Sequence, residues 1–292
     1  MVNQRSLKIL IILGVVFVVW VAINTILHPP WMPKPDLNLP TPTAPPPSPV
    51  SEETNSVPTA VSTISSPPQK PKVMSANGIT GHVKLEGETP PEKLYKLSPD
   101  SECKHSTQIT SKHYTVDANG GLANVFIYVK DGLGGKKFPV PVTSIVLNQQ
   151  NCLYNPYVVG IQVGQTLEIK NGDNFMHNVH GTSPSGKNKE FNIGQPTKTK
   201  DKGIEQKFTK PEVFFEFKCD VHPWMLAYVG IVEHPFFTVT DTDGSFQIPD
   251  LPDGEYTLAA KHPKAGEQTA KVKVVGGKAI ADFIFSSKTD GK

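Results

Sequence analysis

The stretch VFFEFKCDVHPWMLAYVGIV, residues 213–232, consists of two β-type segments joined by a short loop that carries a cysteine, a histidine and a methionine. Successive side chains of a strand point to opposite faces, so alternate residues of the first segment share one face. Those residues are Val213, Phe215, Phe217 and Cys219. The alternation predicts that the Cys219 sulfur points into the protein core at the end of a strand.

Short alternating runs of the same kind continue through the chain from residue 77 onward, separated by glycine, asparagine, aspartate and proline. They include residues 79–87, 122–132, 159–173 and 237–260. In the first of them Ile79, Val83 and Leu85 share a face. Apolar residues do not recur at helical spacing outside the N-terminal segment. The pattern is typical of an all-β sandwich protein.

The N-terminal segment is a separate apolar unit. Residues 9–27 are almost entirely apolar, and a bilayer core needs roughly 20 such residues in a helix. Arg5 and Lys8 precede the run, which predicts that the N-terminus lies on the cytoplasmic side. We therefore expect a single-pass anchor in the cytoplasmic membrane over residues 1–28, with the remainder on the periplasmic or extracellular side. A cleaved signal peptide is the alternative, although no small-residue cleavage pattern follows the run.

Residues 29–76 form a linker rich in proline, serine and threonine, and contain half of the 28 prolines of the chain. Such a composition buries too little apolar surface to fold, so we expect a disordered, extended stalk. The net charge of +2 offers no case for nucleic-acid binding.

The chain has three cysteines, which is an odd number for an exported protein. At least one of them therefore has a role other than an internal disulfide. Our hypothesis is that Cys103 and Cys152 pair and leave Cys219 free for chemistry. Three buried thiols are the alternative, which fits an oxidising compartment poorly.

Cys219, His222 and Met225 stand at three-residue steps in a loop that Pro223 stiffens. Two histidines, a cysteine and a weakly bound methionine are the ligands of blue-copper sites. The missing histidine can come from the upstream run NGDNFMHNVHG, which offers His177 and, as a less favoured candidate, His180. The alternative is a buried thiol beside a chance histidine and methionine.

These motifs resemble the cupredoxin family, specifically its plastocyanin- and amicyanin-like members. The resemblance covers residues 140–234 and rests on the His-Asn-Val context at residues 177–179 and on the short spacing of the cysteine, histidine and methionine. It implies a Greek-key sandwich that binds one type 1 copper. The implied ligands are His177, Cys219, His222 and axial Met225, with Asn178 and Pro223 supporting them from outside. Met176 departs from the plastocyanin pattern, which has proline before the first histidine.

The C-terminal run TVTDTDGSFQIPDLPDGEYTLAA resembles a different family, the carboxypeptidase regulatory-like (transthyretin-like) β-sandwich. The opening strand of that family often reads ITGxV, which occurs here far upstream, at residues 79–83. We therefore expect the cupredoxin domain, residues 138–235, to be inserted into a regulatory-like sandwich formed by residues 77–137 and 236–292. Tandem domains over 77–235 and 236–292 are the alternative.

The resemblance implies an electron carrier with no catalytic activity. Its partners would be other redox proteins, reached from the membrane anchor, and they would dock at Pro223 and Trp224 beside His222. Oxidases and copper nitrite reductases are the enzymatic alternative, but they need a His-Cys-His arrangement, and Lys218 and Asp220 flank the cysteine here. A further alternative is a copper-handling protein, or a surface module that binds carbohydrate or protein without transferring electrons.

Overall fold

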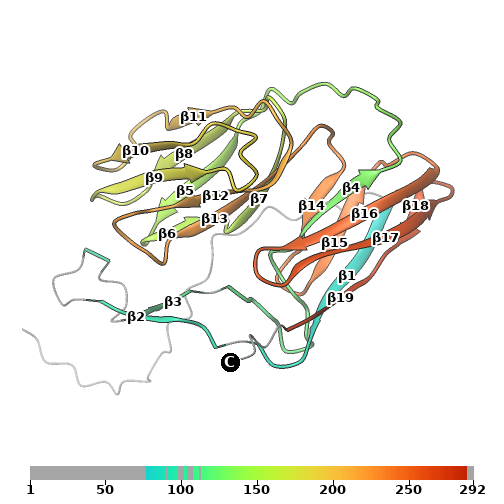
Figure 1. Cartoon of the computed structure of the whole chain (residues 1–292), viewed down its shortest axis with the longest axis horizontal. Helices are drawn as coiled ribbons and strands as arrows, with labels where there is room; N and C mark the ends of the chain where they lie inside the picture. The colour runs from blue at the N-terminus through green and yellow to red at the C-terminus, as the bar shows by residue number, and fades with distance from the viewer. Residues whose placement is uncertain (1–76, 90, 98–101, 104–107, 112, 288–292) are drawn as a thin grey trace, which may run out of the picture. The chain divides into compact units, whose positions relative to one another are not determined.

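The computed structural model describes residues 77–89, 91–97, 102–103, 108–111 and 113–287. These residues form nineteen strands and no helix (Figure 1). The all-β class predicted from the alternating pattern is therefore confirmed for the described part of the chain. The anchor expected over 1–28 and the linker expected over 29–76 lie outside the described residues. Within them, no helix has the length and apolarity needed to cross a bilayer.

Two sheets built from both ends of the described chain enclose a first hydrophobic core. In one sheet β1 pairs with three strands: β1 (Gly78–Glu86) with β15 (Ser245–Pro249), β18 (Lys278–Ile280) and β19 (Phe283–Ser286). The other sheet has the order β14 (Phe237–Val239), β4 (Phe126–Asp131), β16 (Gly254–His262) and β17 (Gly266–Val274). Ile79, Val83 and Leu85 of β1 all point into this core, as the alternation predicts.

The middle of the chain forms a second sandwich with its own core. Its larger sheet has the order β10 (Phe191–Gln195), β9 (His177–Thr182), β12 (Glu212–Lys218), β13 (Leu226–Val232) and β7 (Val158–Gln162). Its smaller sheet has the order β11 (Ile204–Gln206), β8 (Leu167–Asn171), β5 (Ile145–Gln150) and β6 (Leu153–Asn155). A separate hairpin pairs β2 (Leu94–Lys96) with β3 (Gln108–Thr110).

Strand β12 follows the predicted alternation at its C-terminal end and departs from it at its start. Phe215, Phe217 and Cys219 all lie in the second core. The prediction is wrong for Val213, which instead packs against a third apolar cluster together with Phe214. The reason is a shift in the pairing of β12 with β13 before Phe215, which is typical of a β-bulge and reverses the facing of the preceding residues.

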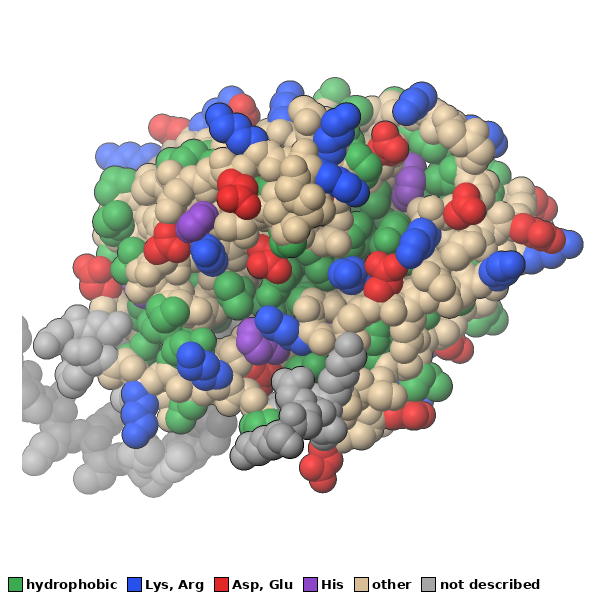
Figure 2. Space-filling view, viewed as in Figure 1, with side chains coloured by type: hydrophobic (Ala, Val, Ile, Leu, Met, Phe, Trp, Pro, Cys, Tyr) green, Lys and Arg blue, Asp and Glu red, His purple; other side chains and the backbone are tan. Residues whose placement is uncertain are grey.

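The third cluster joins residues of the two sandwiches around Phe126 of β4, which is fully buried. Two glycines of the second sandwich, Gly160 and Gly230, pass directly over this ring. A Cβ atom at Gly230 would lie 2.4 Å from the ring, so only glycine leaves room for it. On the outer surface lysines and carboxylates are interspersed (Figure 2).

Candidate metal centre

Cys219 follows the last residue of β12, and its side chain is only 2% exposed. Two backbone hydrogen bonds close the loop behind it: the Cys219 N–H donates to the Met225 carbonyl (3.2 Å), and the Met225 N–H donates to the His222 carbonyl (2.9 Å). The loop therefore turns tightly between β12 and β13. This turn returns the His222 side chain, 8% exposed, to the Cys219 sulfur.

His177 is the first residue of β9 and is fully buried. Strand β9 pairs antiparallel with β12, with His180 opposite Lys218. The start of β9 therefore lies beside the end of β12. Sheet pairing alone thus brings the upstream histidine to the cysteine loop, although more than forty residues separate them in sequence.

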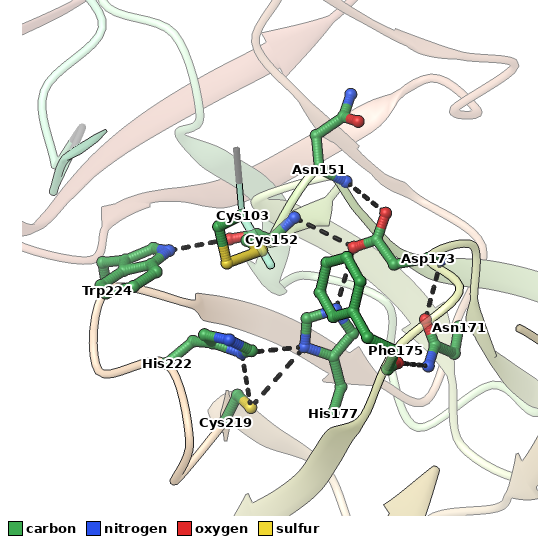
Figure 3. The surroundings of a disulfide bond; sticks show 10 residues. All are labelled: Cys103, Asn151, Cys152, Asn171, Asp173, Phe175, His177, Cys219, His222 and Trp224. Atoms are coloured by element: carbon green, nitrogen blue, oxygen red, sulfur yellow. Dashed lines mark hydrogen bonds and ion pairs between the residues drawn. A yellow bond between two sulfur atoms is a disulfide. The ribbon is translucent and has the colours of Figure 1, made fainter. Parts of the chain in front are cut away.

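Three donor atoms converge at this point (Figure 3). The Nδ1 atoms of His177 and His222 are 3.0 Å apart, and the Cys219 sulfur lies 4.0 Å from the first and 3.6 Å from the second. A point equidistant from the three atoms lies about 2.1 Å from each, within the usual range of metal–nitrogen and metal–sulfur bonds. The donor set and its spacing therefore fit a single metal ion.

The two remaining candidate ligands, Met225 and His180, lie in different surroundings. Met225 is fully buried in the same core as Cys219, and its backbone closes the cysteine loop. His180 lies outside the cluster. Its Nδ1 atom is 3.0 Å from an Asp220 carboxylate oxygen, and its side chain is about a quarter exposed. The donor triangle thus contains His177 and not His180.

Asn178 links the start of β9 to the cysteine loop. Its backbone N–H donates to the Cys219 sulfur (3.5 Å), and its side-chain oxygen accepts the Asp220 N–H (2.7 Å). Its side-chain nitrogen donates to the Asp220 carboxylate (3.0 Å) and to the Asn192 side chain (2.8 Å). These bonds hold the sulfur close to the start of β9.

Asp173 also contacts the donor cluster, which no sequence motif indicates. The Nε2 atom of His177 donates to the Asp173 carboxylate (2.9 Å), which orients the ring so that Nδ1 faces the other donors. The same carboxylate accepts the backbone N–H groups of Asn151 (2.9 Å) and Cys152 (3.0 Å). The only sequence signal was its position four residues before His177, in the same turn.

Aromatic rings pack around the imidazoles. Phe175 lies edge-on to His177, with ring centroids 5.2 Å apart, and closes the pocket on that side. The hydroxyl of Tyr154 lies within hydrogen-bond distance of the carbonyls of Asn178 (3.2 Å) and Lys218 (3.3 Å) and shares its one proton between them, which ties β6 to β9 and to β12. The sequence analysis predicted neither contact, since both depend on which strands become neighbours.

The Cys219 thiol is unusually acidic. Burial raises its pKa, but hydrogen bonds from the two imidazoles and from the Asn178 N–H outweigh burial and bring the pKa to about 6. Burial lowers the pKa of His177, yet its bonds to Cys219 and Asp173 raise it above the ordinary value. Burial likewise raises the pKa of Asp173, and the bonds from the Cys152 N–H and from His177 lower it overall. The pocket therefore stabilises a thiolate, the form that binds metals.

Cys103 and Cys152, the pair named in our hypothesis, form a disulfide beside the centre, and Cys219 is a free thiol. The Trp224 ring turns toward this disulfide, and its Nε1–H donates to the Cys152 carbonyl (2.9 Å). Trp224 is half-buried between His222 and Tyr95 of β2, at centroid distances of 5.4 and 5.6 Å. Of the two residues expected to dock partners, Trp224 is thus largely engaged inside the protein.

Three apolar residues that are adjacent in sequence to the donor histidines are exposed. Pro223 is exposed, Val221 is 53% exposed, and Met176, just before His177, is 49% exposed. His222, which stands between Val221 and Pro223 in the sequence, is itself buried.

Neither a protein-family model nor a curated protein matches the chain. Solved structures match part of it. A Cu(I) amicyanin variant is 22% identical over 35% of this chain and 96% of its own, with a TM-score of 0.26. A copper-containing nitrite reductase from Thermus scotoductus is 25% identical over 35% of this chain and 25% of its own, with a TM-score of 0.27.

A purple cupredoxin from Nitrosopumilus maritimus is 28% identical over 30% of this chain and 97% of its own, with a TM-score of 0.24. These three structures are of an amicyanin, a copper-containing nitrite reductase and a cupredoxin.

Proposed function

We propose that this protein binds one copper ion through His177, Cys219 and His222, with Met225 as a weak axial ligand, and that it carries single electrons between redox partners. The observation that carries the proposal is the triangle of two imidazole nitrogens and a thiolate around a point about 2.1 Å from each. Two imidazoles, a thiolate and a thioether form the ligand set of blue-copper centres.

The bound copper would supply a one-electron couple. The protein's part is to keep the donors in one arrangement, so that no ligand has to move when the charge changes. Asp173 holds the His177 ring by its Nε2–H, and Asn178 holds the Cys219 sulfur by its backbone N–H. Such outer hydrogen bonds set ligand orientation at metal sites.

An electron carrier accounts for the site better than an enzyme does. The donors are buried and closed on one side by Phe175, which leaves little space for a substrate beside the ion. Met176, Val221 and Pro223 are exposed apolar residues that are adjacent in sequence to the donor histidines. We propose that redox proteins dock on these apolar residues, since an apolar surface allows close, short-lived contact. The imidazole of His222 would then carry the electron between the partner and the ion.

For the organisation of the chain, we propose a regulatory-like sandwich of residues 77–137 and 236–292 with the copper domain, 138–235, inserted in it. The pairing of β1 with β15 and of β4 with β16 supports this order, since each pair joins strands from the two outer segments. Residues 1–28 would anchor the protein in the cytoplasmic membrane and 29–76 would act as a stalk on its outer side. Limited proteolysis that yields a stable fragment of 236–292 would refute the insertion.

The experiment that tests the copper proposal is addition of Cu(II) to the purified metal-free protein, followed by visible and electron paramagnetic resonance spectroscopy. We expect an intense blue thiolate-to-copper band, which Cys219→Ser abolishes and His180→Gln, a change outside the donor triangle, preserves. A colourless wild-type protein, or a blue Cys219→Ser variant, would refute it. Reversible voltammetry of the blue form then distinguishes an electron carrier from a copper store.

A further inference from the structure

The Cys103–Cys152 disulfide lies directly against the metal centre (Figure 3). A ring nitrogen of His222 and the two cysteine sulfurs lie within 4.8 Å of one another, and all three residues are buried. The His222 Nδ1 atom is also 3.6 Å from the Cys219 sulfur. One imidazole therefore stands between a free thiol and a pair of sulfurs that are oxidised to each other.

We propose that reduction of this disulfide creates a second metal site, in which the thiolates of Cys103 and Cys152 and the imidazole of His222 bind a soft closed-shell cation such as Cu(I). In the oxidised protein both sulfurs are used in the S–S bond, so this donor set does not exist. With the disulfide intact, the protein has one sulfur-containing metal site. With the disulfide reduced, it has two such sites, which cannot be filled together because both use His222.

The chemical step balances with a dithiol as the reductant. The dithiol attacks the disulfide by thiol exchange, delivers two electrons and two protons, and becomes a disulfide itself. The protein gains two thiols, which release their protons as the metal binds. Thiolate donors select Cu(I) over harder ions, so two thiolates and an imidazole form a soft site.

The backbone around Cys152 is held independently of the disulfide. Its N–H donates to Asp173 (3.0 Å), and its carbonyl accepts the Trp224 Nε1–H (2.9 Å). Both bonds remain when the S–S bond opens. The Cα atoms of the two cysteines are 5.8 Å apart. Rotation of the side chains can then separate the sulfurs to about 3.8 Å, the spacing of two thiolates bound to one tetrahedral ion at about 2.3 Å.

Since His222 belongs to both donor sets, the second site competes with the first. A Cu(I) ion bound to Cys219 and His222 would have two further thiolates close to the same imidazole. Reduction of the pair would therefore draw Cu(I) away from the position that suits reversible electron transfer.

The test uses the full-length Cys219→Ser variant, which lacks the thiolate of the proposed blue site. The protein is reduced anaerobically with dithiothreitol until both remaining thiols titrate, the reductant is removed, and Cu(I) is added in competition with a chromophoric chelator. We expect reduction to raise the Cu(I) affinity by more than about tenfold. Loss of a residue that only hydrogen-bonds to a metal ligand already changes metal affinity by about tenfold or more, and two new ligands should have a larger effect. An affinity equal to that of the oxidised variant would overturn the proposal.

Two controls assign the ligands. Adding Cys103→Ala and Cys152→Ala to the variant removes both thiols without adding bulk to the buried site and should abolish the gain; a gain that survives these changes overturns the proposal. Adding His222→Ala should also lower the affinity of the reduced protein, and full retention would refute the three-donor site. Because Cys219→Ser cannot be blue, these outcomes are independent of the wild-type spectrum that tests the proposed function.

Discussion

The metal-free protein should hold Cys219 as a thiolate at neutral pH. Its pKa of about 6 lies well below the value of about 8.5 for a free cysteine. At pH 7 roughly nine-tenths of the folded molecules should therefore carry the thiolate, against only a few per cent of the unfolded chains. The cause is the pair of imidazoles, with His222 Nδ1 at 3.6 Å and His177 Nδ1 at 4.0 Å from the sulfur.

The lowered pKa of Cys219 also predicts the direction in which the free energy of unfolding changes with pH. Because the pKa of Cys219 is lower in the folded than in the unfolded state, its stabilising contribution is complete above about pH 8.5 and is lost as the pH falls through about 6. A difference of about 2.5 units corresponds to about 3 kcal/mol. His177, whose pKa is raised, contributes in the opposite direction, and its share is lost as the pH rises. Direct titration of the thiolate avoids this cancellation.

The assay follows the ultraviolet absorbance of the thiolate against pH in metal-free protein with its disulfide intact. Cys219→Ser, which has no free thiol, supplies the baseline, and protein unfolded in urea supplies the reference. Replacing His177 by glutamine removes a hydrogen bond to the sulfur and should raise the midpoint by roughly one unit or more. A folded wild-type midpoint at or above about 8, or no change in the His177→Gln variant, would refute the reasoning.

Three further changes should lower the free energy of unfolding of the metal-free protein, measured in urea. Asn178→Ala removes three side-chain hydrogen bonds and should cost about 2–3 kcal/mol. Cys103→Ala with Cys152→Ala opens a link across 49 residues and should cost up to about 4 kcal/mol. Gly230→Ala places a Cβ atom 2.4 Å from the Phe126 ring and should cost about 1–3 kcal/mol.

Matched controls separate these effects from general disturbance. Asn192→Ala removes two hydrogen bonds, one from the Asn178 side chain and one exposed bond to Asp220. It leaves the bonds between Asn178 and Asp220 in place and should cost less than about 1 kcal/mol. At Gly194 the nearest atom to an added Cβ is 3.8 Å away, so Gly194→Ala should be close to neutral. If Gly230→Ala were as mild as Gly194→Ala, the close approach to Phe126 would be wrong.

Local sequence patterns are sufficient to predict the β architecture and the inward direction of the cysteine. Strand alternation is a local property with a period of two residues, so the burial of Phe215, Phe217 and Cys219 could be predicted from their spacing alone. The short loop likewise had to return His222 close to Cys219, because only two residues separate them. Val213 does not follow the alternation, because the pairing of β12 with β13 shifts by one residue before Phe215 and the side chains before the shift point to the opposite face. No local sequence pattern indicates this shift.

Tertiary structure decided which distant residues complete the centre. The choice of His177 over His180 depends on how β9 lies against β12, and the role of Asp173 depends on the nearby turn at Cys152. Each of these contacts joins segments that are far apart in the chain. Their geometry follows from which strands become neighbours, and a local pattern does not specify strand neighbours. The same reason explains why three cysteines could be counted in advance, whereas the position of the disulfide against His222 became apparent only in the folded protein.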